Sequence, residues 1–297
     1  MPASCRVGRL RWRGVRLYAP AVDFQFTERR PTGRLGRYVE SVWHARGQIP
    51  YVRERIAPTG ASVAGIVLGP PIRQTPDGGP TFEAATGFLI GPHDRPLVNE
   101  PTGRTDCVGV VTTPIGCRAV LGVHPGPLRG RVTDLLEAWP AARALRQSLL
   151  TADDDTVLDR TEAVLAAGLD ESDRALDRCA EAVAALEASP ARPVAEVAAD
   201  LGISHGYLDR EFTRVVGMPP RALARVLRVR RLLEQIDVQD DVLWTRLAAD
   251  LGWYDQAHLV RDVTRHTGVP PSAYVRAQRR FLDPDDRAPG FVPESDG

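Results

Sequence analysis

A motif that occurs twice near the end of the chain constrains the fold more than any other feature of the sequence. The first copy, AEVAADLGISHGYLDREFTRVVGMPP, covers residues 195–220, and the second, TRLAADLGWYDQAHLVRDVTRHTGVPP, covers residues 245–271. Equivalent residues are 50 apart up to Gly202 and 51 apart from Leu208 onward, so the second copy has one extra residue in its turn. A repeat of this length indicates one supersecondary unit that is used twice.

Each copy predicts a short helix, a glycine turn and a second helix, which is the pattern of a helix-turn-helix. In the first copy Gly202 ends the first helix, because the position after a helix often needs the left-handed conformation that glycine adopts freely. Ser204 stands where the N-cap of the next helix belongs. That helix ends at Gly217, and its apolar residues form one buried stripe, Leu208, Phe212 and Val215. Gly252 and Gly268 occupy the equivalent places in the second copy.

The buried stripe of each second helix leaves another face pointing outward. The outward residues are Gly206, Asp209, Arg210 and Thr213 in the first copy, and Gln256, Ala257, Val260, Arg261 and Thr264 in the second. Such a face fits the major groove of DNA, where Arg pairs with guanine, Gln with adenine and Asp with cytosine. The alternative is an ordinary helical bundle with arginine on its surface, but two matched units favour DNA recognition.

Two stretches of the repeat, LGISHGYLDREFTRVVGMPP and AADLGWYDQAHLVRDVTRHTGVPPSAY, resemble the DNA-binding domain of the AraC/XylS family of bacterial transcription regulators. The resemblance covers roughly residues 180–282 and implies two helix-turn-helix subdomains joined by a central helix, here about Arg221 to Gln235. It implies that both subdomains enter successive major grooves of double-stranded DNA. It also implies base contacts from Gly206, Asp209, Arg210, Gln256, Ala257, Val260 and Arg261.

The first half of the chain, about residues 14–150, more loosely resembles the N-terminal domain of AraC-like regulators whose ligand is unassigned. The stretches that carry this resemblance are RYVESVWHARG, APTGASVAGIVLG and VVTTPIGCRAVLGVHPGPLRGRVTDLLEAWP. The resemblance implies no chemistry for this domain.

We therefore expect an α+β fold, with a β-rich N-terminal domain followed by an all-α C-terminal domain that holds the two helix-turn-helix subdomains and their central helix. Short apolar runs between Gly and Pro breaks predict strands at 62–69, 85–92 and 106–113, with a hairpin loop at 73–80. Helices are expected at 131–147, 151–169 and 172–188. The expected divisions are an N-terminal sensing or dimerisation domain (1–150), a helical linker (151–190), the DNA-binding domain (191–282) and a disordered tail (283–297).

The charge of the chain predicts local rather than general attraction to nucleic acid. The formal net charge is zero, with 38 basic and 38 acidic residues, and residues 192–281 contain 14 arginines against 11 acidic residues. Binding should therefore depend on where individual arginines lie. Candidate phosphate contacts are Arg221, Arg225, Arg228, Arg230 and Arg231 on the central helix and Arg276, Arg279 and Arg280 at the end of the domain.

The remaining sequence signals favour a cytoplasmic bacterial protein without a disulfide framework. The four cysteines, Cys5, Cys107, Cys117 and Cys179, form no C-x-x-C pair, so they indicate reduced thiols rather than a zinc or redox site. The sequence contains no signal-peptide pattern and no run of about 18 apolar residues. We expect no contact with a membrane.

A binding or catalytic site in the N-terminal domain is the main alternative left open. His44, His93 and His124 are isolated and no H-x-H occurs, so we expect no metal site, no cofactor and no catalytic residues. A group of aromatic residues forms either core or the wall of an effector pocket, namely Tyr38, Trp43, Tyr51, Phe82 and Phe88.

The expected function is a sequence-specific, DNA-binding transcription regulator with double-stranded DNA as its partner. A small-molecule effector, RNA polymerase and a second copy of the chain, held through the N-terminal domain, are further candidate partners. The rival interpretations are an enzyme or metal-binding N-terminal domain with a DNA-targeting tail, and an interaction module that has lost DNA binding. Retention of Arg210 and Arg261 at equivalent positions argues against the loss of DNA binding.

The turn of the second unit yields a first prediction. Changing Gly252 to Val should destabilise the protein by roughly 1–3 kcal/mol, because a β-branched residue is costly at positive φ. Thermal unfolding checks this, and an unchanged melting temperature would remove the basis for placing the turn at this glycine.

Overall fold

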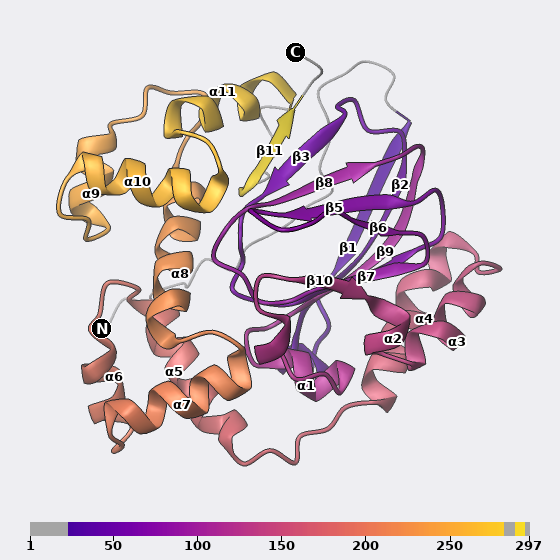
Figure 1. Cartoon of the computed structure of the whole chain (residues 1–297), viewed down its shortest axis with the longest axis horizontal. Helices are drawn as coiled ribbons and strands as arrows, with labels where there is room; N and C mark the ends of the chain where they lie inside the picture. Colours follow the sequence, from indigo (N-terminus) through magenta and orange to yellow (C-terminus); the bar gives the residue numbers. More distant parts are fainter. Residues whose placement is uncertain (1–22, 282–288, 295–297) are drawn as a thin grey trace, which may run out of the picture.

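A computed structural model describes residues 23–281 and 289–294 of the chain, in which a β-rich part is followed by a helical part (Figure 1). The strands of two sheets lie side by side at one side of the molecule, and the helices of the repeat lie at the other. One long helix, α8 (Pro220–Gln235), runs upright beside the sheets and links the two repeat units. The expected α+β class and the order of its two parts are confirmed.

The β-rich part consists of two antiparallel sheets. One sheet has the order β1 (Phe24–Arg29), β2 (Val39–Gly47), β9 (Thr105–Thr112), β4 (Val63–Val67), β7 (Gly87–Ile90) and β10 (Val132–Asp134). The other has the order β11 (Phe291–Glu294), β3 (Arg53–Ile56), β8 (Leu97–Pro101), β5 (Ile72–Pro76) and β6 (Phe82–Ala84). The three apolar runs of the sequence form β4, β7 and β9, and the predicted hairpin loop joins β5 to β6.

Two glycines of the larger sheet let aromatic rings lie directly on the backbone. A Cβ atom on Gly109 would stand 2.0 Å from the Trp43 ring, and one on Gly65 would stand 2.2 Å from the Phe88 ring. Both contacts are far too short for any larger residue, so these strand positions require glycine. The two rings are thereby held at the inner side of the sheet.

Short helices cover one end of the sheets. They are η1 (Leu35–Arg37), α1 (Gly116–Leu121), η2 (Gly126–Leu128), α2 (Leu135–Ala138), α3 (Ala141–Leu149) and α4 (Asp154–Ala167). The expectation of one helix over 131–147 is wrong: Val132 to Asp134 pair with β7 as β10, and the helical remainder is interrupted at Trp139 and Pro140. Asp134 then caps α2, since its carboxylate accepts from the amides of Leu136 and Glu137 at 2.7 and 3.0 Å.

The segment expected to be a linker contributes to both parts of the molecule. Helix α4 packs against β2 and α3, whereas α5 (Ala175–Ala188) packs against α7 (His205–Val216) and α8. Buried residues of α4, α5 and α7 belong to one continuous apolar core together with residues of β2, β4 and β9. The helical part is therefore joined to the sheets by packing as well as by the chain.

Both repeat units adopt the predicted helix-turn-helix. The first consists of α6 (Val194–Asp200) and α7, and the second of α9 (Trp244–Asp250) and α10 (Gln256–Thr267). The turn glycines Gly202 and Gly252 have φ values of 66° and 79°, as the turn assignment requires. At Gly252 an added Cβ would also stand 3.0 Å from Ala191. The central helix, expected at about Arg221 to Gln235, is α8, and α11 (Pro271–Phe281) follows the second unit.

Part of the C-terminal tail is ordered, contrary to expectation. Residues Phe291–Glu294 form β11, which pairs antiparallel with β3 and so returns the end of the chain to the N-terminal domain (Figure 1). The Tyr274 hydroxyl accepts from the Gly290 amide at 3.1 Å and anchors this return to α11. The rest of the expected tail, and the expected basic arm at 1–13, lie outside the described residues.

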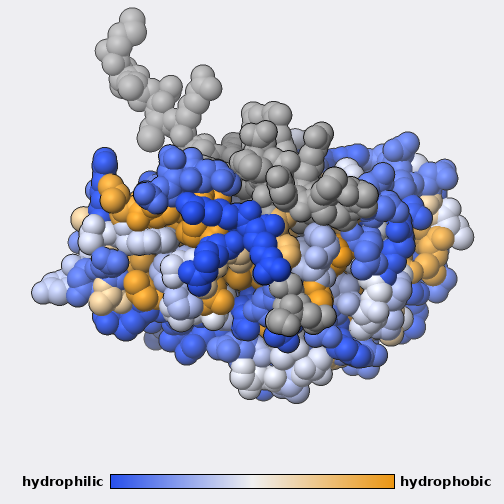
Figure 2. Space-filling view, turned by 90° about the horizontal axis from the view of Figure 1, so that it is seen from above, coloured by the Kyte–Doolittle hydropathy of each residue, from blue (hydrophilic) through white to orange (hydrophobic). Residues whose placement is uncertain are grey.

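Two further observations concern the surface and the thiols. Figure 2 shows a largely hydrophilic face on which apolar residues appear in separate patches. Within the described ranges, no helix is both long and apolar enough to cross a membrane. Cys107, Cys117 and Cys179 are buried and unpaired with one another, and burial raises the pKa of the Cys117 thiol to about 11.

Candidate nucleic-acid interface and a cavity between the sheets

The second helix of each repeat unit is held by a turn and a cap of the predicted kind. Ser204 caps α7, since its hydroxyl accepts from the Tyr207 amide at 3.2 Å. Asp255 caps α10 in the same way, accepting from the His258 amide at 2.6 Å. Because both helices begin at a capped residue and end at a glycine of positive φ, their outward faces are fixed in equivalent orientations.

The residues predicted to contact bases lie on these outward faces. Five of them are exposed, namely Gly206, Arg210, Gln256, Ala257 and Arg261. Asp209, Val260 and Thr264 are half-buried beside them. The hydroxyl oxygen of Thr213 is buried without a hydrogen-bond partner, so it is not accessible to a base.

The sequence reasoning missed two tyrosines near the start of these helices. Tyr254 is 93% exposed just before the cap of α10, and Tyr207 is 39% exposed in the first turn of α7. A tyrosine hydroxyl is one of the groups that donate to DNA phosphates. For Tyr254 the signal was present in the sequence, because this residue adjoins the N-cap Asp255 and lies outside the apolar stripe of α10.

The arginines of the central helix are used mainly inside the protein. Arg230 forms ion pairs with Glu40 of β2 at 2.7 Å and with Glu234 at 3.2 Å. Arg228 lies over the Trp253 ring, 5.5 Å from its centroid. The expectation that Arg230 contacts phosphate is therefore wrong, because its charge is committed to a carboxylate of the N-terminal domain.

Equivalent residues of the two units dock the helical part onto the rest of the molecule. Arg214 of α7 pairs with Asp173 at 2.6 Å, and Arg265, at the matching position of α10, pairs with Asp94 at 2.7 Å. The glycines that end the two helices also make equivalent close contacts. A Cβ on Gly217 would meet Pro92 and Pro125 at 2.8–2.9 Å, and one on Gly268 would meet Arg55 and Pro96 at 3.0–3.1 Å. Both units therefore dock through the C-terminal ends of their second helices, and the outward faces near the N-terminal ends stay exposed.

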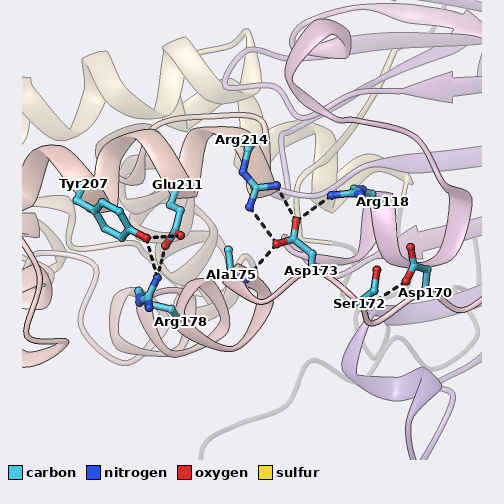
Figure 3. Close-up of polar contacts among 9 residues, drawn as sticks. All are labelled: Arg118, Asp170, Ser172, Asp173, Ala175, Arg178, Tyr207, Glu211 and Arg214. Carbon is cyan, nitrogen blue, oxygen red and sulfur yellow. Dashed lines mark hydrogen bonds and ion pairs between the residues drawn. The ribbon is translucent and has the colours of Figure 1, made fainter.

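The first of these docking contacts forms a small charged network (Figure 3). The Asp173 carboxylate accepts from Arg214 and from Arg118 of α1 at 2.9 Å, and from the Ala175 amide at 3.0 Å. Its side chain is only 14% exposed. The hydrogen bond from Arg214 is the main reason why the pKa of Asp173 is lowered to about 2. One carboxylate thus joins α7 to the N-terminal domain.

A neighbouring cluster fixes α7 against α5. Arg178 donates to Glu211 at 2.6 Å, and the Tyr207 hydroxyl donates to the other oxygen of the same carboxylate at 2.8 Å (Figure 3). The Arg178 guanidinium also lies over the Tyr207 ring, 5.5 Å from its centroid. This cluster positions the exposed Tyr207 at the start of the outward face of α7.

One loop of the N-terminal domain contacts both units. The segment 91–96, GPHDRP, joins β7 to β8 and carries Pro92, Asp94 and Pro96, which make the contacts described above. The histidine of this segment, His93, lines a cavity. The loop therefore connects that cavity to both repeat units.

The cavity has a volume of about 240 Å³ and lies between the two sheets. Its apolar walls include aromatic rings from both sheets, namely Phe24, Phe26, Trp43, Tyr51, Phe88 and Phe291. Its polar lining includes four carboxylates, Glu28, Glu40, Glu54 and Glu234. Two elements of the helical part and tail, α8 and β11, contribute to its wall through Leu233 and Pro293. Of the five aromatic residues expected to form either core or pocket wall, Trp43, Tyr51 and Phe88 line the cavity, whereas Tyr38 lies in the core and Phe82 packs against a core cluster that also contains Phe88.

The three histidines of the N-terminal domain lie apart. His44 contacts Asp106 at 2.9 Å, and His93 contacts the Gly91 carbonyl at 2.9 Å. Over the residues that the structure describes, no three His, Cys, Asp or Glu side chains gather in a way that could hold a metal ion.

Comparisons with protein families match both parts of the chain. A family described as a helix-turn-helix domain matches residues 197–277, which span both repeat units. A family described as a domain of unknown function (DUF6597) matches residues 27–134, which span most of the two sheets. No curated protein matches the sequence.

The solved structures that match include ToxT, an AraC-like activator and a cupin. ToxT from Vibrio cholerae is 11% identical, with 85% of this chain and 98% of that chain covered and a TM-score of 0.43. The AraC-like transcriptional activator CuxR is 14% identical, covering 70% of this chain and 86% of that chain at a TM-score of 0.24. An RmlC-like cupin from Shewanella frigidimarina is 9% identical over 33% of this chain and 83% of its own, also at a TM-score of 0.24.

The docking network yields a second prediction. Changing Asp173 to Asn should lower the free energy of unfolding by about 1–2 kcal/mol at pH 7, because two arginines lose a charged acceptor. The lowered pKa means that the wild-type carboxylate stabilises the fold above about pH 4, and that this contribution disappears as the pH falls toward 2. Denaturant titrations at pH 7 and pH 3 should therefore show a smaller difference at the lower pH.

Asp170 provides the matched control, since it is exposed on the same segment and bonds locally to the Ser172 amide at 2.9 Å (Figure 3). A loss in the Asp173→Asn variant no greater than in Asp170→Asn would contradict the docking role of Asp173.

Proposed function

We propose that this chain, which belongs to the AraC/XylS family of DNA-binding transcription regulators, reads DNA with both repeat units and is controlled from the cavity. The observation that carries the proposal is the equivalent docking of α7 and α10, which leaves matching faces of the two helices exposed. Regulators of this type are not typically enzymes, and we propose a binding role for the N-terminal domain. A regulator of the bacterial chromosome acts in the cytoplasm.

The proposed base contacts lie at the N-terminal ends of the two reading helices. They are Gly206, Asp209 and Arg210 on α7, and Gln256, Ala257, Val260 and Arg261 on α10, with Thr264 behind them. The two sets differ in chemistry, since Asp209 accepts hydrogen bonds where Val260 offers only apolar contact. The proposal therefore implies a site without two-fold symmetry for each monomer.

The length of α8 supports simultaneous binding by both units. Its 16 residues span about 24 Å, since a helix rises 1.5 Å per residue. Successive major grooves on one face of DNA are about 34 Å apart. Both units meet those grooves if the DNA bends toward the protein, and bending of this kind is a common route to specificity.

The position of the cavity supports control of DNA binding by an effector. Its wall includes α8, which separates the two units, and His93 of the loop whose neighbours Pro92, Asp94 and Pro96 touch both of them. A ligand that prefers one placement of these elements would shift the relative orientation of the units by population shift. Dimerisation through the N-terminal domain and contact with RNA polymerase remain proposals that rest on the family alone.

Arg261 provides a test of base readout. Changing Arg261 to Ala should cost about 1–3 kcal/mol of binding free energy at the specific site and relax the preference at one base pair. The measurement is a gel-shift titration against the selected site and against single-base variants of it. Arg143, exposed on α3 away from the repeat, provides the control, and Arg143→Ala should bind as the wild type does. Unchanged specific binding by Arg261→Ala would rule out this residue as a reader.

The spacing of the site provides a test of two-unit binding. Once the specific site is known from DNA selected by the purified protein, about 5 bp inserted between its halves rotates one groove to the opposite face. Footprinting should then show protection of one half only, with a large loss of affinity. Affinity indifferent to the insertion would show that only one unit reads DNA.

A further inference from the structure

Two hydrogen-bond acceptors of the cavity lining are buried and lack a partner. The Gln74 side chain is only 1% exposed, and its Oε1 has no hydrogen-bond partner. The His93 side chain is likewise buried, and its Nε2 has no partner. Both residues line the cavity.

The hydrogen-bond network fixes which atom of each group faces the cavity. The Asn99 amide nitrogen donates to the Glu54 carboxylate at 2.9 Å, so the Asn99 oxygen faces Gln74. The Gln74 amide nitrogen must therefore be the group that donates to this oxygen. The carbonyl oxygen of Gln74 is therefore the atom without a partner. His93 donates from Nδ1 to the Gly91 carbonyl, and burial lowers its pKa, so the neutral ring leaves Nε2 as an acceptor.

Several of the donors that line the cavity are already used by its acceptors. The Tyr51 hydroxyl donates to Glu54 at 2.7 Å, and Ser41 is hydrogen-bonded to Glu28. Arg230, a guanidinium of the cavity wall, donates to Glu40 and Glu234. Among the described lining residues, the buried Thr105 hydroxyl also lacks a partner and can either donate or accept. The Gln74 oxygen and the His93 nitrogen can only accept, so a ligand must supply donors to satisfy them.

The charged groups of the cavity also favour a ligand that donates hydrogen bonds and carries positive charge. Among the described residues that line the cavity, there are four carboxylates and one guanidinium, that of Arg230. The aromatic rings around them present negatively polarised faces, which attract a cation in a desolvated site. Carboxylate, ring face and unpaired acceptor are the three groups that recognise an organic ammonium ion.

We propose that the cavity between the sheets binds an organic cation, a protonated amine on an apolar body, through Glu28, Glu54, Gln74 and the aromatic wall. This inference deepens the effector role stated under the proposed function and rests on it. The volume of about 240 Å³ lies just below the usual range for small-molecule pockets, roughly 300–1,000 Å³, so the ligand is small.

Two of the carboxylates give the binding a definite pH dependence. Burial is the main cause that raises the pKa of Glu28 and of Glu54 to about 7. The groups that face Glu28 are Ser41, Arg30 and Glu40, and those that face Glu54 are Tyr51 and Asn99. A cation binds the ionised form, so the affinity should rise as the pH increases from 6 to 8 and protons should be released on binding. A carboxylic acid ligand would show the opposite trend.

The test uses the full-length protein and matched sets of small probes. Each set contains an amine and the corresponding alcohol and acid: hexylamine, hexanol and hexanoate; phenylethylamine, phenylethanol and phenylacetate; tryptamine, tryptophol and indole-3-acetate. Thermal shift ranks the sets, and isothermal titration calorimetry measures the best amine at pH 6, 7 and 8. We expect at least one amine to bind tenfold or more tightly than its alcohol and acid, with affinity that increases severalfold over this range. If no amine is preferred in any set, or if an acid is preferred, the proposal is wrong.

Variants locate the binding. Glu28→Gln and Glu54→Gln keep the side-chain shape, and each should weaken the amine severalfold and reduce the pH dependence. Glu83→Gln, which changes an exposed carboxylate of β6 outside the cavity, should bind as the wild type does. Equal binding by the wild type and both cavity variants would overturn the proposal. If one cavity variant fails to fold, the other variant and the wild-type probe sets still decide it.

A gel-shift titration with and without the best amine separates this inference from the proposed function. Amine binding that changes DNA affinity supports both. Amine binding that leaves DNA affinity unchanged supports the cation site and contradicts control from the cavity. If no amine binds and DNA binding is intact, the cation site is contradicted and the proposed function is not.

Discussion

The attachment of both repeat units by the C-terminal ends of their reading helices determines how the rest of the structure is used. Arg214 and Arg265 occupy the same position in the two copies, and each forms an ion pair outside its own unit. The matching glycines, Gly217 and Gly268, let the N-terminal domain approach the helix ends closely. Because the attachment is at one end of each helix, the opposite ends remain exposed as a pair, and their separation is set by α8.

The same attachment places the cavity where it can influence the units. The wall of the cavity is completed by α8 and by β11. Neither element belongs to the N-terminal stretch of sequence that forms the other strands. Arg230 ties α8 to Glu40 of β2 across this wall. A ligand that competes for Glu40 would loosen one contact between the sheets and the central helix, and the loop 91–96 would carry any shift of His93 to both units.

The chemistry of the cavity follows from its construction between two sheets. Closely packed strands exclude water, so the carboxylates of Glu28 and Glu54 are desolvated and their pKa values rise to about 7. Such groups are costly to keep ionised without a partner. A cationic ligand would pair with the carboxylates and the unpartnered acceptors. The cavity therefore prefers cations, a preference that its apolar walls alone would not create.

The sequence by itself determined the two helix-turn-helix units, their turns at Gly202 and Gly252, and the faces that carry Arg210 and Arg261. These features depend on helical periodicity, caps and glycine conformation, all of which act over a few residues. No local pattern distinguishes Arg230 from its neighbours on α8, and none predicts β11. Those outcomes depend on contacts between residues far apart in the chain: Arg230 meets Glu40 across 190 residues, and Arg265 meets Asp94 across 171. Only the tertiary structure decided which arginines stay exposed on the outward faces and which hold the domains together, because a local pattern cannot specify a partner that the fold alone brings within reach.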